Sequence, residues 1–423
     1  GFARILMKYL VKNCLLEGGE KVDILVEGGK IVSLSTKSLK VDDALVIDAE
    51  GLWAIPGLVD MHTHARVPGQ EHKETLESLS KAALRGGYTH LLIMPNTEPP
   101  IDSPEVFEYV KSLTKGLPVN VFISATITKG RMGKELVEMG MLKEGGAKAF
   151  TDDGNWVEDD FVMLNACTYA SNFDVMVISH SEKPQLSKGF ANYDEKTLKY
   201  GMKFRLPISE ELAVYRDCRL AEISGCHLHV AHISYYGSVE VIKMFKERGA
   251  NITCEVTPHH LIFSTDNIEP YNPNFICNPP IRDEENRRKL VRALKEGFID
   301  IVATDHAPHA YYEKEITVDE TLPGIEGLET SFSALYTHLV LPGDMDIKTL
   351  IDVMSHKPAK LLGIDNSIRE GNEANFFLFN PNIKWVVKGS DILSKGKNNP
   401  FIGKELRGRV VSVFCKGKYI KEV

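Results

Sequence analysis

Residues 58–68, Leu-Val-Asp-Met-His-Thr-His-Ala-Arg-Val-Pro, place two histidines directly after an apolar run that begins at Leu52. Side chains alternate between the two faces of a β-strand, so His62 and His64 should point to the same side. Two imidazoles on one face at the end of a buried strand can chelate one metal ion. Arg66 keeps the same parity if the strand persists, and it would hold an anion beside that metal. The alternative is that these are ordinary polar residues at a strand end.

Seven more apolar segments follow this one, and helical patterns separate most of them. The strand candidates lie near residues 58–64, 88–95, 119–125, 147–151, 174–180, 227–232, 252–256 and 300–305. The helical patterns lie at residues 74–85, 103–114, 209–223, 238–248 and 283–296. Eight strands that alternate with helices over roughly 300 residues predict an α/β protein built on a (β/α)8 TIM barrel. A doubly wound open sheet is the alternative, although no G-x-G-x-x-G motif follows the first strand.

Both ends of the chain show short strand patterns separated by turn signals. Strands are expected at residues 22–26, 31–34, 375–379 and 409–414, with turns at 27–30 and 416–418. Two β-rich ends that flank one large middle can pair into a single domain, because chain termini often lie close together. We therefore expect a small β-sandwich domain from residues 1–57 plus 361–423, and a barrel domain from residues 58–360.

The composition narrows the class of protein. The chain has 423 residues, of which 43% are hydrophobic, and a net charge of −8 without a long basic run, which disfavours a nucleic-acid partner. No apolar stretch approaches the roughly 20 residues of a membrane span. Seven scattered cysteines without a CxxC pair favour the cytoplasm and argue against disulfides. Residues 1–6 lack a signal-peptide layout, and we expect them to be an added leader, with Met7 the natural start.

Residues that can bind metal recur at the carboxyl ends of the predicted strands, where barrels build their active sites. They are His62, His64, Asp153, His180, His232 and Asp305. Imidazole and carboxylate without thiolate suit Zn²⁺ first, with Mn²⁺, Fe²⁺ or Co²⁺ as alternatives. Six ligands are too many for one tetrahedral ion, so two ions fit the count better, although one or two could be bound. His62, His64 and Asp305 would hold one ion, His180 and His232 the other, and Asp153 would bridge them.

Seven short motifs occur along the chain, and together they are very specific. They lie at residues 60–69 (DMHTHARVPG), 94–97 (MPNT), 149–154 (AFTDDG), 229–234 (HVAHIS), 254–261 (CEVTPHHL), 278–280 (NPP) and 303–309 (ATDHAPH). With these motifs the chain resembles dihydroorotases, and more closely the bacterial type I class of the amidohydrolase superfamily. The resemblance is collinear from about Lys8 to the C-terminus.

The resemblance implies roles for individual residues. It implies the same six metal ligands and a general base and acid, Asp305. It implies that the dihydroorotate ring and carboxylate are bound by Arg66, Asn96, Asn278 and His309, with backbone contacts from Gly324. Related classes bridge the metals with a carboxylated lysine; Asp153 matches the type I aspartate, and Lys148 on the same strand is the alternative. Val67 stands where the family usually has an acidic residue, which we expect to alter loop support more than chemistry.

The implied activity is that of a zinc-dependent cyclic amidohydrolase. It would interconvert L-dihydroorotate and N-carbamoyl-L-aspartate, the third step of pyrimidine synthesis, with Asp305 moving a proton from a metal-activated hydroxide to the leaving ring nitrogen. A hydantoinase or allantoinase is the nearest alternative, and a non-catalytic scaffold is another. A small-molecule substrate is the expected partner, without nucleic acid or membrane; a homodimer and an association with aspartate transcarbamoylase are further hypotheses.

Asp60 is either a partner of the site or an ordinary strand residue, and residues 310–324 are either a loop over the site or a surface loop.

Overall fold

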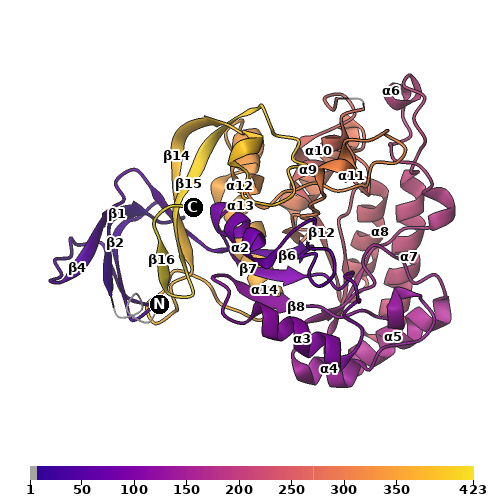
Figure 1. Ribbon diagram of the computed structural model, residues 1–423, viewed down its shortest axis with the longest axis horizontal. Coiled ribbons are helices and arrows are strands. Elements are labelled where there is room, and N and C mark those ends of the chain that lie inside the picture. The colour runs from indigo at the N-terminus through magenta and orange to yellow at the C-terminus, as the bar shows by residue number, and fades with distance from the viewer. Residues whose placement is uncertain (1–6, 270) are drawn as a thin grey trace.

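The computed structural model describes residues 7–269 and 271–423 (Figure 1). It consists of a β-rich part, which contains both the first and the last strands, and a larger part in which helices surround short strands. The expectation about residues 1–6 lies outside the described residues. Within the described part of the chain, no helix is both long and apolar enough to cross a membrane.

Eight parallel strands form the centre of the larger part. They are β6 (Leu58–Thr63), β7 (Tyr88–Ile93), β8 (Asn120–Ile123), β9 (Ala149–Phe150), β10 (Met176–Ser179), β11 (Leu228–Val230), β12 (Ile252–Val256) and β13 (Ile301–Val302). β6 to β8 form one sheet and β9 to β13 another, each paired in chain order. Single parallel bridges, Ala125 to Phe150 and Thr63 to His306, join the two sheets at both edges. The α/β alternation expected from the sequence is therefore confirmed, and a strand lies at each of the eight candidate segments.

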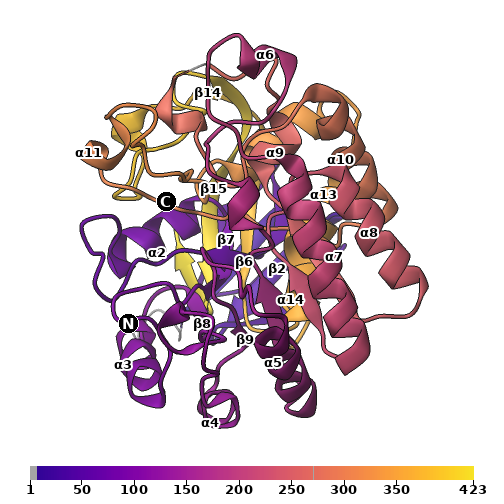
Figure 2. The same ribbon diagram turned by 90° about the vertical axis from the view of Figure 1, so that its right-hand side faces the viewer.

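Helices lie around these strands (Figure 2). The longer ones are α2 (Leu76–Arg85), α3 (Pro104–Thr114), α4 (Met139–Gly145), α5 (Asp160–Asn172), α7 (Pro207–Ser224), α8 (Tyr236–Glu247) and α10 (Glu284–Glu296). Short helices are α6 (Glu195–Leu198), α9 (Pro258–Ile262), α11 (Tyr311–Lys314), α12 (Ser331–Leu335), α13 (Ile347–Ile351) and α14 (Lys357–Leu361). The starts of α2, α3 and α10 follow local chemistry, because Thr75, Ser103 and Asp283 each accept a hydrogen bond from a first-turn N–H.

The two ends of the chain form one mixed sheet. Its order is β16 (Lys418–Ile420), β15 (Glu405–Cys415), β14 (Phe376–Val386), β5 (Trp53–Pro56), β1 (Lys8–Leu15), β2 (Lys21–Glu27) and β3 (Lys30–Ser35), with β4 (Ala44–Asp48) beside β1. The antiparallel pair β5 and β14 joins the N-terminal to the C-terminal strands. The rings of Phe376 and Phe414 stack at 4.6 Å, and Tyr9 packs edge-on against Phe414. The expectation that both ends build one β structure is thus confirmed.

The chain passes from the mixed sheet to the parallel strands at Gly57. The apolar run from Leu52 is therefore divided between β5 and β6, rather than leading into one strand. A Cβ added at Gly57 would lie 2.0 Å from Thr89 Oγ1, so only glycine fits here. The junction sets where β6 begins and hence where His62 and His64 emerge.

Candidate metal centre and substrate cavity

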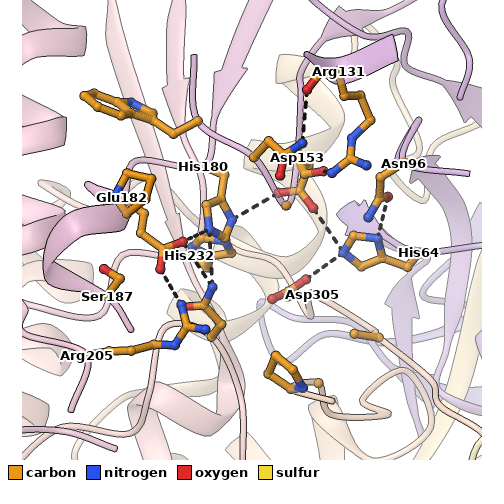
Figure 3. Close-up of a pocket in the computed structure, with 18 of the residues that line it drawn as sticks. His64, Asn96, Arg131, Asp153, His180, Glu182, Ser187, Arg205, His232 and Asp305 are labelled. Atoms are coloured by element: carbon orange, nitrogen blue, oxygen red, sulfur yellow. Dashed lines mark hydrogen bonds and ion pairs between the residues drawn. The ribbon is translucent and has the colours of Figure 1, made fainter. Parts of the chain in front are cut away.

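A cavity of about 580 Å³ opens at the carboxyl ends of the parallel strands (Figure 3). Of the residues proposed from the sequence, the cavity is lined by His64, Arg66, Asn96, Asp153, His180, His232, Asn278, Asp305, His309 and Gly324. His62 lies beneath its floor and is fully buried. The structure therefore brings the whole set together, from eight separate segments of the chain.

Two histidines and two aspartates converge at the end of β6. His62 Nε2 lies 3.1 Å from Asp305 Oδ1 and 3.3 Å from Asp153 Oδ2. His64 Nε2 lies 3.1 Å and 3.2 Å from the same two oxygens. Both imidazoles thus face one point between the carboxylates, as their two-residue spacing predicted.

A second group of ligand atoms shares Asp153 with the first. His180 Nδ1 lies 3.6 Å from Asp153 Oδ1 and 2.9 Å from His232 Nε2. Within each group, His62–His64–Asp153 and Asp153–His180–His232, the ligand atoms lie within 4.8 Å of one another. A shared carboxylate between two histidine pairs is the arrangement expected for two neighbouring ions.

Two buried atoms at the centre of this cluster make no hydrogen bond to the described residues. They are His62 Nε2 and Asp153 Oδ1, and both face the other ligand atoms. An unsatisfied buried polar atom is costly unless something else binds it. A metal ion accepts lone pairs from both an imidazole nitrogen and a carboxylate oxygen, so the residues fit one.

The electrostatics of the cluster favour a cation. Burial raises the pKa of Asp153 and of Asp305, but the nearby histidines, His62 above all, lower both below the ordinary value. Burial lowers the pKa of His62, but the carboxylates around it raise it well above its ordinary value. The carboxylates are therefore ionised, and the cluster attracts positive charge.

Carboxylates and an amide orient the imidazoles from behind. Glu255 Oε2 accepts from His62 Nδ1 at 2.9 Å, and Glu182 Oε2 accepts from His180 Nε2 at 2.6 Å. Asn96 Oδ1 accepts from His64 Nδ1 at 3.0 Å. Each bond leaves the other ring nitrogen for a metal ion, and such bonds fix the tautomer and orientation of metal-binding histidines.

Glu255 and Glu182 were not singled out in the sequence. Glu255 is fully buried in β12 and also accepts from His229 Nε2 at 2.8 Å. Its place inside an apolar strand could have indicated a buried partner, because a glutamate is rarely buried without one. Glu182 also pairs with Arg205 and accepts from Asn278 Nδ2 at 3.1 Å.

Asp217 on α7 supports the segment around His180 and was also missed. Its Oδ2 accepts from Ser179 Oγ at 2.5 Å and from Ser181 Oγ at 2.7 Å, on either side of His180. The same oxygen accepts from Trp156 Nε1 at 3.0 Å, and Trp156 forms part of the cavity wall. One buried carboxylate thus fixes a ligand segment and a wall of the cavity together.

The prediction that Arg66 faces the cavity by strand parity needs correction. β6 ends at Thr63, and Arg66 has a left-handed backbone with φ 65°. Arg66 reaches the cavity through this turn, and its Nε donates to Pro308 O at 3.1 Å. His232 and Asp305 also have positive φ, at 31° and 50°. Strained backbone of this kind concentrates at functional sites.

Asp60, Lys148 and Val67 lie in three different surroundings. Asp60 accepts from Thr304 N at 2.8 Å and Thr304 Oγ1 at 2.6 Å, so it holds the residue before Asp305. Lys148 is exposed, and its ammonium packs 5.2 Å from the Phe122 ring, away from the cavity lining. Val67 is buried beside Arg66.

Part of the 310–324 segment reaches the cavity. Pro323 and Gly324 line it, whereas Tyr311 and Tyr312 are exposed. Gly324 has φ 155°, and an added Cβ would lie 2.7 Å from His309 Nε2. A side chain at this position would therefore displace His309.

Comparisons with known sequences agree on one family. A family model described as dihydro-orotase-like matches residues 51–238. The chain is 42% identical to a dihydroorotase of Carboxydothermus hydrogenoformans over 97% of both chains. It is 41% identical to a dihydroorotase of Aquifex aeolicus, covering 98% of this chain and 99% of the relative.

Solved structures with the same fold have another activity in their names. An L-hydantoinase (dihydropyrimidinase) of Arthrobacter aurescens superposes with a TM-score of 0.87 at 26% identity, covering 98% of this chain and 96% of that one. A D-hydantoinase of a Thermus species gives a TM-score of 0.84 at 26% identity, covering 98% and 95%. Fold likeness alone therefore does not choose between these activities.

Replacing Glu255 with glutamine should weaken metal binding. The amide keeps the size of the side chain but loses the charge that holds His62, so we expect metal affinity to fall by about 10–100-fold. Competition with a chromophoric chelator measures this affinity. Glu247→Gln, on the exposed end of α8, is the control. Unchanged affinity in Glu255→Gln would show that Glu255 does not support the metal centre.

Proposed function

Because the chain belongs to the dihydroorotase family, we propose that the cluster of His62, His64, Asp153, His180, His232 and Asp305 is the metal centre of a dihydroorotase. The reaction interconverts L-dihydroorotate and N-carbamoyl-L-aspartate, the third step of de novo pyrimidine synthesis. The observation that carries the proposal is the geometry of the cavity floor, where two histidine pairs share Asp153. Arg66 lines the same cavity and supplies positive charge for a substrate carboxylate.

We further propose that the ring of parallel strands is a (β/α)8 TIM barrel over residues 58–360. Residues 1–57 plus 361–423 would form the β-sandwich domain. Support comes from the pairing of β6 to β13 in chain order with a bridge at each edge, and from the β5–β14 pairing of the two chain ends. In such barrels the carboxyl ends of the strands carry the active site.

We assign the ligands as two sets. His62, His64 and Asp305 would hold one ion, and His180 and His232 another, with Asp153 between them. The nitrogen and oxygen ligands favour Zn²⁺, one or two ions per chain. A bound metal ion would supply Lewis acidity and lower the pKa of water toward neutrality.

Asp305 is the proposed general base and acid. Its Oδ1 lies 3.1 Å from both His62 Nε2 and His64 Nε2, and its carboxyl is ionised, so it can accept a proton. It would take the proton of the attacking water and deliver it to the ring nitrogen as the amide bond breaks. Ring closure uses the same group in reverse.

Substrate orientation is assigned to the polar wall of the cavity. Arg66 would pair with the substrate carboxylate through a two-pronged contact, which fixes the ring relative to Asp305. Asn96, Asn278, His309 and the backbone of Gly324 would contact the rest of the ring and carboxylate. Asn96 and Asn278 also hold His64 and Glu182, so the substrate wall and the metal ligands share supports.

The alternatives differ in substrate charge or in catalysis. A hydantoinase or allantoinase would not need a buried arginine for a ring carboxylate, whereas Arg66 is only 7% exposed in the cavity wall. A non-catalytic scaffold would not need a complete set of metal ligands. We also propose a cytoplasmic protein that forms a homodimer and associates with aspartate transcarbamoylase.

Asp305→Asn should abolish turnover but leave substrate binding largely intact. An amide cannot accept and return the proton, and general acid–base catalysis contributes roughly 10²–10⁴-fold. Steady-state assays with dihydroorotate, together with metal analysis of the same sample, separate lost proton transfer from lost metal. Near-normal kcat in the purified variant would refute the role of Asp305.

Arg66 variants test the substrate. Arg66→Lys keeps the positive charge but loses the two-pronged guanidinium contact, and Arg66→Met loses the charge as well. The kcat/KM for dihydroorotate should therefore fall in both variants, and further in Arg66→Met. The loss in Met should be about 1.5–3 kcal/mol, the value of a charged hydrogen bond. Dihydrouracil, which lacks the carboxylate, should be a poor substrate and barely respond to either change. A parent enzyme that prefers dihydrouracil or hydantoins would favour the hydantoinase alternative.

A further inference from the structure

Lys73 is a buried lysine beside the substrate cavity that the proposed mechanism does not use. It lies between β6 and α2 and is only 7% exposed. Its Nζ lies 3.1 Å from His309 Nδ1 and 3.2 Å from Glu313 Oε2. Burying an ammonium is costly unless its protons are bound, so these two contacts explain where it can sit.

The contacts of His309 assign the position of its proton. A lysine ammonium has only donors, so His309 Nδ1 must accept and carries no proton. On the other side of the ring, His309 Nε2 lies 2.9 Å from Pro323 O, which can only accept. Nε2 therefore carries the proton, and two independent contacts assign the same tautomer.

The surroundings of His309 also favour a single proton on the ring. Burial lowers the pKa of His309, and the charges of Arg66, Lys73 and Lys314 lower it further, well below its ordinary value. Arg66 Nη2 lies 3.5 Å from Nε2. Since both of these nitrogens carry protons, this longer contact is an approach of two donors rather than a hydrogen bond.

Glu313 competes for the same ring nitrogen. Its Oε1 lies 3.9 Å from His309 Nδ1, and its other oxygen pairs with Lys73. Burial raises the pKa of Glu313, but the backbone N–H of Ala310 and the charge of Lys73 lower it below its ordinary value, so it is ionised. Without Lys73, this carboxylate would attract a proton to Nδ1.

We propose that Lys73 is a positioning residue that keeps the proton of His309 on Nε2, so that on substrate binding His309 turns this proton from Pro323 O to an oxygen of the substrate carboxylate. The proposal rests on the assignment of His309 to substrate binding. Nε2 faces the backbone of Gly324, where no side chain blocks its approach to the cavity. With the proton on Nδ1 instead, His309 would present a lone pair to a carboxylate, and the two would repel each other.

The first test is the tautomer itself, measured by NMR on zinc-loaded protein with ¹⁵N-labelled histidine and no substrate. The His309 signals are identified by their loss in His309→Gln. The parent should show an unprotonated Nδ1 and a protonated Nε2. In Lys73→Met the proton should move to Nδ1, toward Glu313 and at the expense of the bond from Nε2 to Pro323 O, whereas Lys73→Arg should keep the parental pattern. A parental His309 with its proton on Nδ1, or an unchanged tautomer in Lys73→Met, overturns the proposal.

The second test measures KM and kcat separately, with dihydroorotate as the substrate. Lys73→Met should raise KM roughly tenfold, the effect of one lost hydrogen bond, with a smaller change in kcat. Adding Glu313→Leu removes the competing carboxylate and should partly restore both KM and the tautomer. Lys81→Met, on the exposed face of α2, is the matched control. A double variant that stays as impaired as Lys73→Met contradicts the proposed competition.

These outcomes separate the inference from the function on which it rests. If the parent does not turn over dihydroorotate, the proposed function fails, whatever the NMR spectra show. If His309→Gln keeps the parental KM, His309 does not bind substrate and the inference is overturned. If Lys73→Met does not fold, Lys73→Arg and the double variant carry both measurements.

Discussion

The buried negative charge at the strand ends is the constraint on which the rest of the structure depends. Asp153, Asp305 and Glu255 all lie within 3.3 Å of the single imidazole of His62. Burying each carboxylate costs several kcal/mol unless opposite charge is close, and a neutral imidazole supplies none. A divalent cation supplies the missing charge, so we regard the parallel strands as a frame that holds six ligands for it.

The substrate end of the cavity depends on the C-terminal part of the chain. Asn398 is buried, and its Oδ1 accepts from His309 N at 3.1 Å. Its Nδ2 donates to Ala307 O and Gly324 O, both at 2.9 Å. A residue from the segment between β14 and β15 thus holds the backbone on both sides of the proposed carboxylate site. The C-terminal segment therefore supports binding as well as the mixed sheet.

The sequence predicted the features that follow from a local pattern, such as an apolar strand that ends in a metal-binding side chain. The apolar runs end at His62, His180 and Asp305, and parallel strands bring such ends together, so a shared site followed. The pairing of the two chain ends could be predicted because both have short strands and turns. The fold is shared with hydantoinases, whereas the closer sequence similarity is to dihydroorotases. The sequence motifs therefore indicate the activity, and the fold alone does not.

Other features depend on contacts between distant residues or on backbone strain. Glu255 orients His62 from 193 residues away, and Lys73 reaches His309 across 236 residues. Such contacts could not be predicted from sequence periodicity, because each of these residues is a single polar side chain without a local pattern that names its partner. The left-handed turn at Arg66 broke the strand parity used to place it, although the side chain still reached the cavity.

We expect this cluster to work only with a bound metal ion. Its most direct test is to strip the purified protein with a chelator, add Zn²⁺ back in steps, and measure bound zinc and dihydroorotate turnover in the same samples. Turnover should be lost on stripping and return in proportion to the zinc bound, reaching its limit at one or two ions per chain. Full turnover in protein that contains no metal would contradict it.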